Sequence, residues 1–192
     1  VWIARHFKAD GKKIDRDTAE YLAFITGGMM TDLSNEIEKL VAYSRGETIT
    51  KADVDAVVIP VLDAAAYELT DAILSGKRAA SMEKLGELFA MGEPPHKILF
   101  SISMKLRQLL CAKACILSGV GIDEFMKMCS VRYEFQAKSV LTSAKRHTLS
   151  ECRNMVTASS NAAYVLNSSA QEPEEVLKEL IVRLLTIDCT KD

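Results

Sequence analysis

The most constraining feature of this sequence is the spacing of its apolar residues, which recur every three or four positions in run after run. Within residues 94–118, Leu99, Ile102, Leu106 and Leu109 share one face of a helix, because an α-helix turns once every 3.6 residues. No segment shows the strict alternation of apolar and polar residues that is typical of a half-buried strand. A content of only 4 Pro, 9 Gly and 6% aromatic residues also favours helices over a β-sandwich or barrel. We therefore predict an all-α fold.

Glycine and proline residues divide the apolar runs into two groups of helices. The first group fills residues 1–62, and we expect a compact three-helix unit there, with helices near 15–26, 31–44 and 51–59. The second group fills residues 63–192 and forms a helical bundle. Its expected helices lie at 64–74, 77–91, 94–118, 123–129, 132–145, 149–166 and 173–187. The sequence thus predicts two domains, with a boundary between residues 62 and 63.

The longest expected helix is the segment 94–118, which Pro94 and Pro95 open and which would extend roughly 35 Å at 1.5 Å per residue. Its first half is amphipathic, and its polar side carries Lys105 and Gln108, which we expect to be exposed. Its second half, residues 109–117, is apolar on nearly every side. A helix that is apolar all round is normally buried, so we expect this half at the centre of the second unit.

Charge and composition exclude some classes of protein and leave others open. A hydrophobic content of 48% supports a packed core, and a net charge of -2 argues against a protein that binds polyanions with its whole surface. One stretch is nevertheless basic, with Glu134 as its single acid between residues 127 and 147. Its cations are Lys127, Arg132, Lys138, Lys145 and Arg146. This stretch is interpreted as a nucleic-acid contact, a partner-protein contact or an ordinary solvated surface.

The sequence offers no set of residues for catalysis. It contains neither of the glycine-rich motifs that cradle nucleotide phosphates, and its histidines, His6, His96 and His147, are far apart and are expected at the surface. The cysteines have no C-x-x-C spacing, which favours buried, reduced thiols over a metal or redox pair. They are Cys111, Cys115, Cys129, Cys152 and Cys189. We identify no catalytic residue, no cofactor-binding residue and no metal ligand, and we expect no cofactor.

The beginning of the chain and its longest uncharged run bear on localisation. Residues 1–6 have no basic segment followed by an apolar stretch, so they are not a signal peptide, and we expect them to belong to a longer protein that is cut at a domain boundary. The run from Asn154 to Gln171 is too polar for a membrane span, which needs about 20 mostly apolar residues. We therefore expect a cytoplasmic protein without membrane contact.

Residues 27–40, which read G-G-M-M-T-D-L-S-N-E-I-E-K-L, carry the most specific motif of the chain. This block resembles the glycine-then-L-x-N-E-x-E-K-L signature of the delta subunit of the bacterial DNA polymerase III clamp loader. The signature residues are Asn35, Glu36, Glu38, Lys39 and Leu40. Further blocks resemble that family in the same order: I-T-K-A-D-V at 49–54, Y-E-L-T-D-A-I at 67–73, G-E-P-P at 92–95 and R-Q-L-L at 107–110.

The resemblance implies a specific architecture and role. Delta subunits have an AAA+-like base domain, a helical lid and a helical collar, so residues 1–62 would be the AAA+-type lid and residues 63–192 the collar, without the base domain. The subunit helps to open and load the sliding clamp on DNA during replication. The implied partners are the ATPase and delta-prime subunits through the collar, the sliding clamp through the missing N-terminal domain, and DNA in the full assembly. Lys105 and Gln108 are the candidate interface residues of the collar.

One departure from related ATPases concerns the start of the second lid helix. In nucleotide-binding relatives a Gly-x-x-Arg senses the nucleotide there, whereas this chain has Gly28-Met29-Met30-Thr31. Because Thr31 cannot supply a cation to a phosphate, the resemblance implies a non-catalytic, non-ATP-binding subunit of a DNA-directed DNA polymerase holoenzyme. Two alternatives stay open: the lid and collar of another AAA+ loader subunit, and a stand-alone helical nucleic-acid-binding domain that uses the basic stretch.

Overall fold

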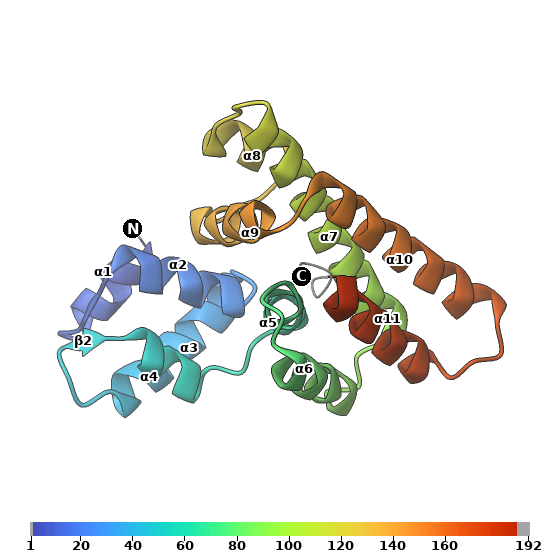
Figure 1. Ribbon diagram of the computed structural model, residues 1–192. Helices are drawn as coiled ribbons and strands as arrows, with labels where there is room; N and C mark the ends of the chain where they lie inside the picture. The colour runs from blue at the N-terminus through green and yellow to red at the C-terminus, as the bar shows by residue number, and fades with distance from the viewer. Residues whose placement is uncertain (1, 188–192) are drawn as a thin grey trace. The chain divides into compact units, whose positions relative to one another are not determined.

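The computed structural model of this chain describes residues 2–187, except for the side chains at positions 62 and 63. Within that part of the chain, the regular structure consists of eleven α-helices and one sheet of two very short strands (Figure 1). The all-α prediction is confirmed. The chain divides into two compact units, Val1–Ala65 and Ala66–Asp192.

The first unit contains more elements than the expected three-helix arrangement. Besides three helices near the predicted positions, it has an additional N-terminal helix and a pair of parallel two-residue strands, in which Lys13 lies opposite Thr48 and Ile14 opposite Ile49. Its elements are α1 (Trp2–Ala9), β1 (Lys13–Ile14), α2 (Arg16–Ile25), α3 (Met30–Tyr43), β2 (Thr48–Ile49) and α4 (Lys51–Val57). Helix α1 is part of the fold because Phe7 lies fully buried in the core of this unit.

The helices of the first unit begin at side chains that satisfy their free backbone amides. Asp15 precedes α2 and accepts hydrogen bonds from the Thr18 amide at 2.9 Å and the Thr18 hydroxyl at 2.6 Å. These bonds favour the carboxylate and lower the pKa of Asp15. Thr50 and Asp53 form a reciprocal capping box at the start of α4. At the C-terminal end of α3, the Lys12 ammonium donates hydrogen bonds to backbone carbonyls. A cation at this end of a helix also complements the helix dipole.

The second unit consists of seven helices, and the longest of them is its central element. Helix α7 packs against α10 and α9 and also meets α8 and α11, while α11 contacts α6 as well (Figure 1). The helices are α5 (Leu62–Leu74), α6 (Arg78–Ala90), α7 (Pro95–Leu117), α8 (Ile122–Met128), α9 (Glu134–Arg146), α10 (Leu149–Ser168) and α11 (Pro173–Ile187). These bounds agree with the predicted helices to within about two residues at each end.

The burial of α7 differs from the prediction in its second half. Leu109, Ala112 and Cys115 are buried against neighbouring helices, as expected for a central helix. Leu117, however, is 64% exposed, and Ala114 is also exposed. The expectation that residues 109–117 are buried on all sides was therefore wrong, because the neighbouring helices leave one side of α7 uncovered.

Candidate assembly surfaces

The signature block lies on α3, where only part of it serves the core. Leu40 is fully buried among the apolar residues of the first unit. Glu36 pairs with Lys39 at 2.6 Å, one helical turn away, while Asn35, Glu38 and Lys39 are exposed. The core therefore accounts for Leu40 but leaves the exposed polar residues of the signature without a packing role.

The start of α3 presents no cation to a ligand. Met29 occupies the N-cap position without a side-chain hydrogen bond to the helix, and Thr31 is exposed in the first turn. The helix begins after two glycines, Gly27 and Gly28, both with positive φ, a backbone conformation that other residues rarely adopt. These glycines are therefore explained by the turn between α2 and α3.

Lys105 is not exposed, which corrects the expectation from the helical pattern. Only 6% of its surface is accessible, and its Nζ lies 3.8 Å from the centroid of the Tyr67 ring on α5. Burial lowers the pKa of Lys105 to about 7, and the nearby Asp71 carboxylate opposes that shift. A residue buried in this way within its own chain cannot provide an exposed interface contact.

A polar junction ties α5, α7 and α9 together around Lys105. The Ser139 hydroxyl on α9 donates to the Asp71 carboxylate on α5 at 2.6 Å. Tyr67 packs edge-on against Phe135, with ring centroids 6.2 Å apart. The Y-E-L-T-D-A-I motif thus supplies two side chains, Tyr67 and Asp71, that fix α5 against the longest helix and against α9.

Gln108 also has a role within the chain. Its side chain is half-buried, and its Nε2 donates to the backbone carbonyl of Cys129 at 3.5 Å, just after α8. Lys105 and Gln108, the two candidate interface residues, are therefore directed toward α5 and toward the segment just after α8.

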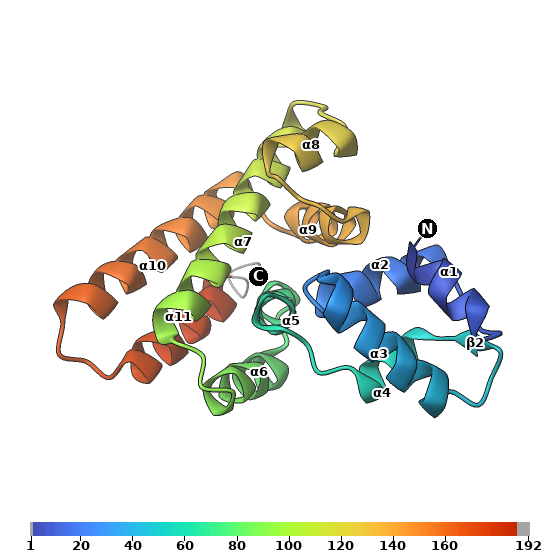
Figure 2. The same cartoon turned by 180° about the vertical axis from the view of Figure 1, so that it is seen from behind.

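The side of α7 that no neighbouring helix covers is mostly apolar. Figure 2 shows α7 in front of α10 and α11, whereas Figure 1 shows the opposite side of the bundle. Phe100 is 65% exposed, Met104 lies one turn further on, and Leu117 is near the end of the helix. We call this set the uncovered α7 face and define it as Phe100, Met104, Arg107, Cys111, Ala114 and Leu117, of which Cys111 alone is half-buried and lies beside Cys129.

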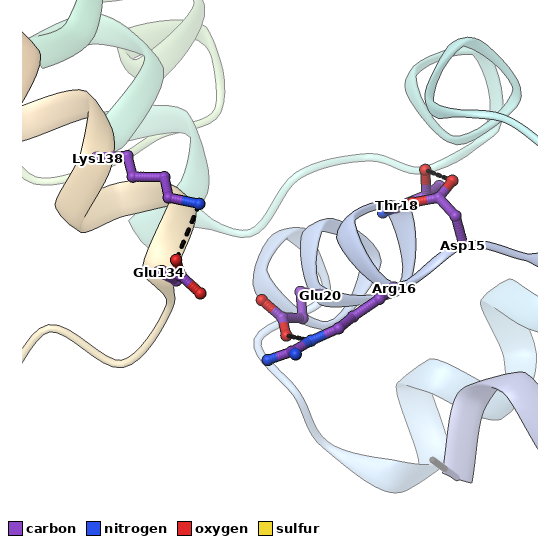
Figure 3. A network of polar contacts seen from close by, with 6 residues as sticks. All are labelled: Asp15, Arg16, Thr18, Glu20, Glu134 and Lys138. Carbon is purple, nitrogen blue, oxygen red and sulfur yellow. Dashed lines mark hydrogen bonds and ion pairs between the residues drawn. The ribbon is translucent and has the colours of Figure 1, made fainter. Parts of the chain in front are cut away.

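The five cations of the basic stretch are all exposed, as the sequence predicted, but they do not form one continuous patch on a single element. Lys127 is on α8, and Arg132 lies between the helices, 5.4 Å from the centroid of the Tyr133 ring. The remaining three, Lys138, Lys145 and Arg146, are on α9. Lys138 pairs with Glu134 at 2.9 Å (Figure 3).

The histidines and cysteines provide no catalytic or metal centre within residues 2–187. His147 is only 2% exposed, which corrects the expectation of a surface side chain, because it lies at the turn from α9 into α10 with Glu151 3.7 Å away. His6 and His96 are exposed. Cys111, Cys115, Cys129 and Cys152 form no disulfide, and Cys189 lies outside the described residues. No cluster of three His, Cys, Asp or Glu side chains in this part of the chain could hold a metal ion.

Comparison with known proteins decides the family. The model of the DNA polymerase III delta subunit, C-terminal domain, matches residues 63–184. The chain belongs to this delta-subunit family. Its curated relatives include the DNA polymerase III subunit delta of Bacillus subtilis, which is 26% identical over 179 residues, covering 93% of this chain and 51% of the relative. A probable DNA polymerase III subunit delta of Aquifex aeolicus is 21% identical over 192 residues, covering 99% of this chain and 55% of the relative.

A solved structure extends the likeness to both units of this delta-family chain. The Bacillus subtilis DNA clamp loader delta protein superposes with a TM-score of 0.76 at 25% identity, covering 96% of this chain and 55% of that one. The chain thus spans about half the length of the delta relatives that it matches. Among the described residues, none of the helices combines the length and apolar content needed to cross a bilayer.

Proposed function

We propose that this chain provides the lid and collar regions of a clamp-loader delta subunit and that its role is assembly with the other loader subunits. In this proposal residues 1–62 form the AAA+-type lid and residues 63–192 form the collar. The division of the fold at Ala65 and Ala66 lies close to this boundary. The whole subunit would act in the cytoplasm, where the loader opens the sliding clamp and places it on DNA.

The observation that carries the proposal is the family match across residues 63–184, which covers α6 to α10 completely and nearly all of α5 and α11. The matched region is a helical bundle whose polar junction holds α5, α7 and α9 in a fixed arrangement. A rigid bundle of this kind supports a scaffold, because subunit interfaces of a standard size, about 1,600 Å² in total, need a preformed surface.

The proposal also assigns no nucleotide chemistry to this chain. Thr31 occupies the place where ATP-binding relatives have arginine, and the sequence carries no glycine-rich phosphate-binding motif. We propose that ATP is bound by the partner ATPase subunits and that this subunit is non-catalytic. Contact with the sliding clamp would come from a domain outside this chain.

Co-purification tests the proposed role. Tagged chain is mixed with the loader's ATPase and delta-prime subunits and washed at increasing salt, with an unrelated helical protein carrying the same tag as the control. We expect a stoichiometric complex that survives moderate salt, because the apolar part of an interface is not screened by ions. Recovery of the tagged chain alone, under conditions where the partner subunits bind each other, would reject the proposal.

A second candidate function is contact with DNA through the five exposed cations. It is favoured by their exposure and by the scarcity of acids in the stretch, where Glu134 is the single acid between residues 127 and 147. Binding of this kind weakens steeply as salt rises, because each neutralised phosphate releases counterions. We expect Lys145→Glu combined with Arg146→Glu to weaken DNA binding and to flatten its salt dependence in an anisotropy titration. Lys97→Glu, at an exposed lysine outside the stretch, is the control.

A further inference from the structure

Helix α7 buries one apolar side in the bundle, but two of its polar side chains are also covered and several of its large apolar side chains are exposed. An amphipathic helix at the edge of a bundle normally buries its apolar side and exposes its polar side. Here Lys105 is buried and Gln108 is half-buried, whereas Phe100, Met104 and Leu117 are exposed. Burying a lysine carries a desolvation cost, and exposing large apolar side chains forgoes their burial. If another protein covers the exposed apolar side chains, their burial is no longer lost.

The uncovered α7 face is continuous along the helix. Its residues are three or four positions apart, which places them in one row on the helix surface. From Phe100 to Leu117 this row is roughly 26 Å long at 1.5 Å per residue. It contains one charged residue, Arg107, which forms no ion pair with any of the described residues. The face is therefore an apolar row with a single unpaired cation near its middle.

We propose that the uncovered α7 face docks a helix of a neighbouring clamp-loader subunit, which presents apolar side chains to Phe100 and Met104 and a carboxylate to Arg107. This inference rests on the proposed function, because it names the surface through which the collar meets its partner. Docking would remove water from the Arg107 guanidinium, which then requires a charged or hydrogen-bonding group. We therefore expect the partner helix to carry an acidic residue opposite Arg107.

The position of Arg107 argues against a second copy of this chain as the occupant. Two identical α7 faces related by a two-fold axis would pair either parallel, which places the two Arg107 side chains at the same height, or antiparallel about an axis near the middle of the row. In the antiparallel pairing Arg107 is about one to two residues from that midpoint, so the two guanidinium groups would lie roughly 5 Å apart along the helix axes. Repulsion between these like charges disfavours the symmetric dimer, whereas a different partner with a carboxylate turns the same charge into an attraction.

Two substitutions test this surface, each with a matched control on α10. Phe100→Asp places a charge in the apolar row, and Tyr164→Asp places the same charge at a 74% exposed aromatic residue outside it. Arg107→Glu reverses the unpaired charge, and Arg153→Glu reverses an exposed arginine on α10. Each variant is titrated with the purified ATPase and delta-prime subunits, while circular dichroism and thermal melting establish that it is folded.

We expect Phe100→Asp and Arg107→Glu to weaken the complex by about tenfold or more, since central aromatic and arginine residues commonly dominate interfaces. The controls should bind as the wild type does. Wild-type affinity for both folded α7 variants, or equal losses in the α10 controls, would overturn this inference while leaving the proposed function intact. Dimerisation of the isolated chain that Phe100→Asp abolishes would identify a second copy as the occupant and also overturn it. Failure of the wild type to bind either subunit would instead reject the proposed function.

Discussion

At the scale of the residue, Lys105 is the side chain whose environment differs most from that of a surface lysine. The unfolded chain keeps the Lys105 proton up to about pH 10, whereas the folded chain releases it near pH 7. Between these two values the unfolded state binds more protons, so the free energy of unfolding increases as the pH increases. Below pH 7 both states are protonated, and the full cost of the buried charge is present.

We therefore predict that the wild-type chain is more stable at pH 9 than at pH 7, by up to a few kcal/mol, since one pKa unit corresponds to about 1.4 kcal/mol. Lys105→Met should stabilise the chain near pH 7 and reduce this pH dependence, because the thioether keeps the contact with the Tyr67 ring without a charge. Urea denaturation at both pH values measures the effect. Lys97→Met, at an exposed position of the same helix, is the control. A Lys105→Met profile identical to that of the wild type would contradict the prediction.

The burial of individual side chains was the property that the sequence predicted least well. The 3.6-residue pattern identified one apolar side of α7 correctly, including Leu99 and Ile102. It could not show that Tyr67 and Ser139, more than thirty residues away in the chain, cover the opposite side around Lys105. Burial of His147 was missed for the same reason, since the turn between α9 and α10 that encloses it is a feature of the tertiary structure.

At the scale of the element, α10 combines a strong N-terminal cap with a long contact against α7. The Thr148 hydroxyl accepts from the Glu151 amide at 3.2 Å, and the Glu151 carboxylate accepts from the Thr148 amide at 2.6 Å. This reciprocal pair satisfies two donors that the helix itself leaves without a partner.

We predict that Thr148→Ala lowers the free energy of unfolding by about 1 kcal/mol, which is the usual cost of removing an N-cap hydroxyl. Thermal or urea denaturation measures the change. Thr157→Ala provides the control, because Thr157 is exposed within the same helix and alanine has the higher helix propensity. If Thr157→Ala were as destabilising as Thr148→Ala, the cap would not be the cause.

Most helices were predicted well, because the residues that begin and end a helix lie next to it in the sequence. Pro95 at the first position of α7 and Gly119 just beyond its end mark the two limits directly in the sequence. Helix α1 was missed because its sequence has no capping motif like the Thr50–Asp53 box that marks the equally short α4, and strands of two residues are too short to show an alternation. The apolar second half of α7 was interpreted as core, although part of it faces away from the bundle, because an apolar pattern does not show which side of a helix its neighbours leave uncovered.

At the scale of the whole molecule, the chain consists of two compact units and spans about half the length of the delta relatives that it matches. Its second unit has a polar junction that fixes its helices and an apolar face on α7 that its own helices leave open. These properties suit a scaffold, whose contribution is a surface of fixed shape and not a chemical step.

The central claim, that this chain assembles with other loader subunits, is tested most directly by the molar mass of the mixture. Purified chain is combined with the ATPase and delta-prime subunits and measured by light scattering during size-exclusion chromatography at moderate salt. We expect a single species whose mass includes one copy of this chain together with the partner subunits. Separate peaks, with this chain eluting at its monomer mass of 21.2 kDa while the partner subunits associate without it, would show that the chain does not assemble with them.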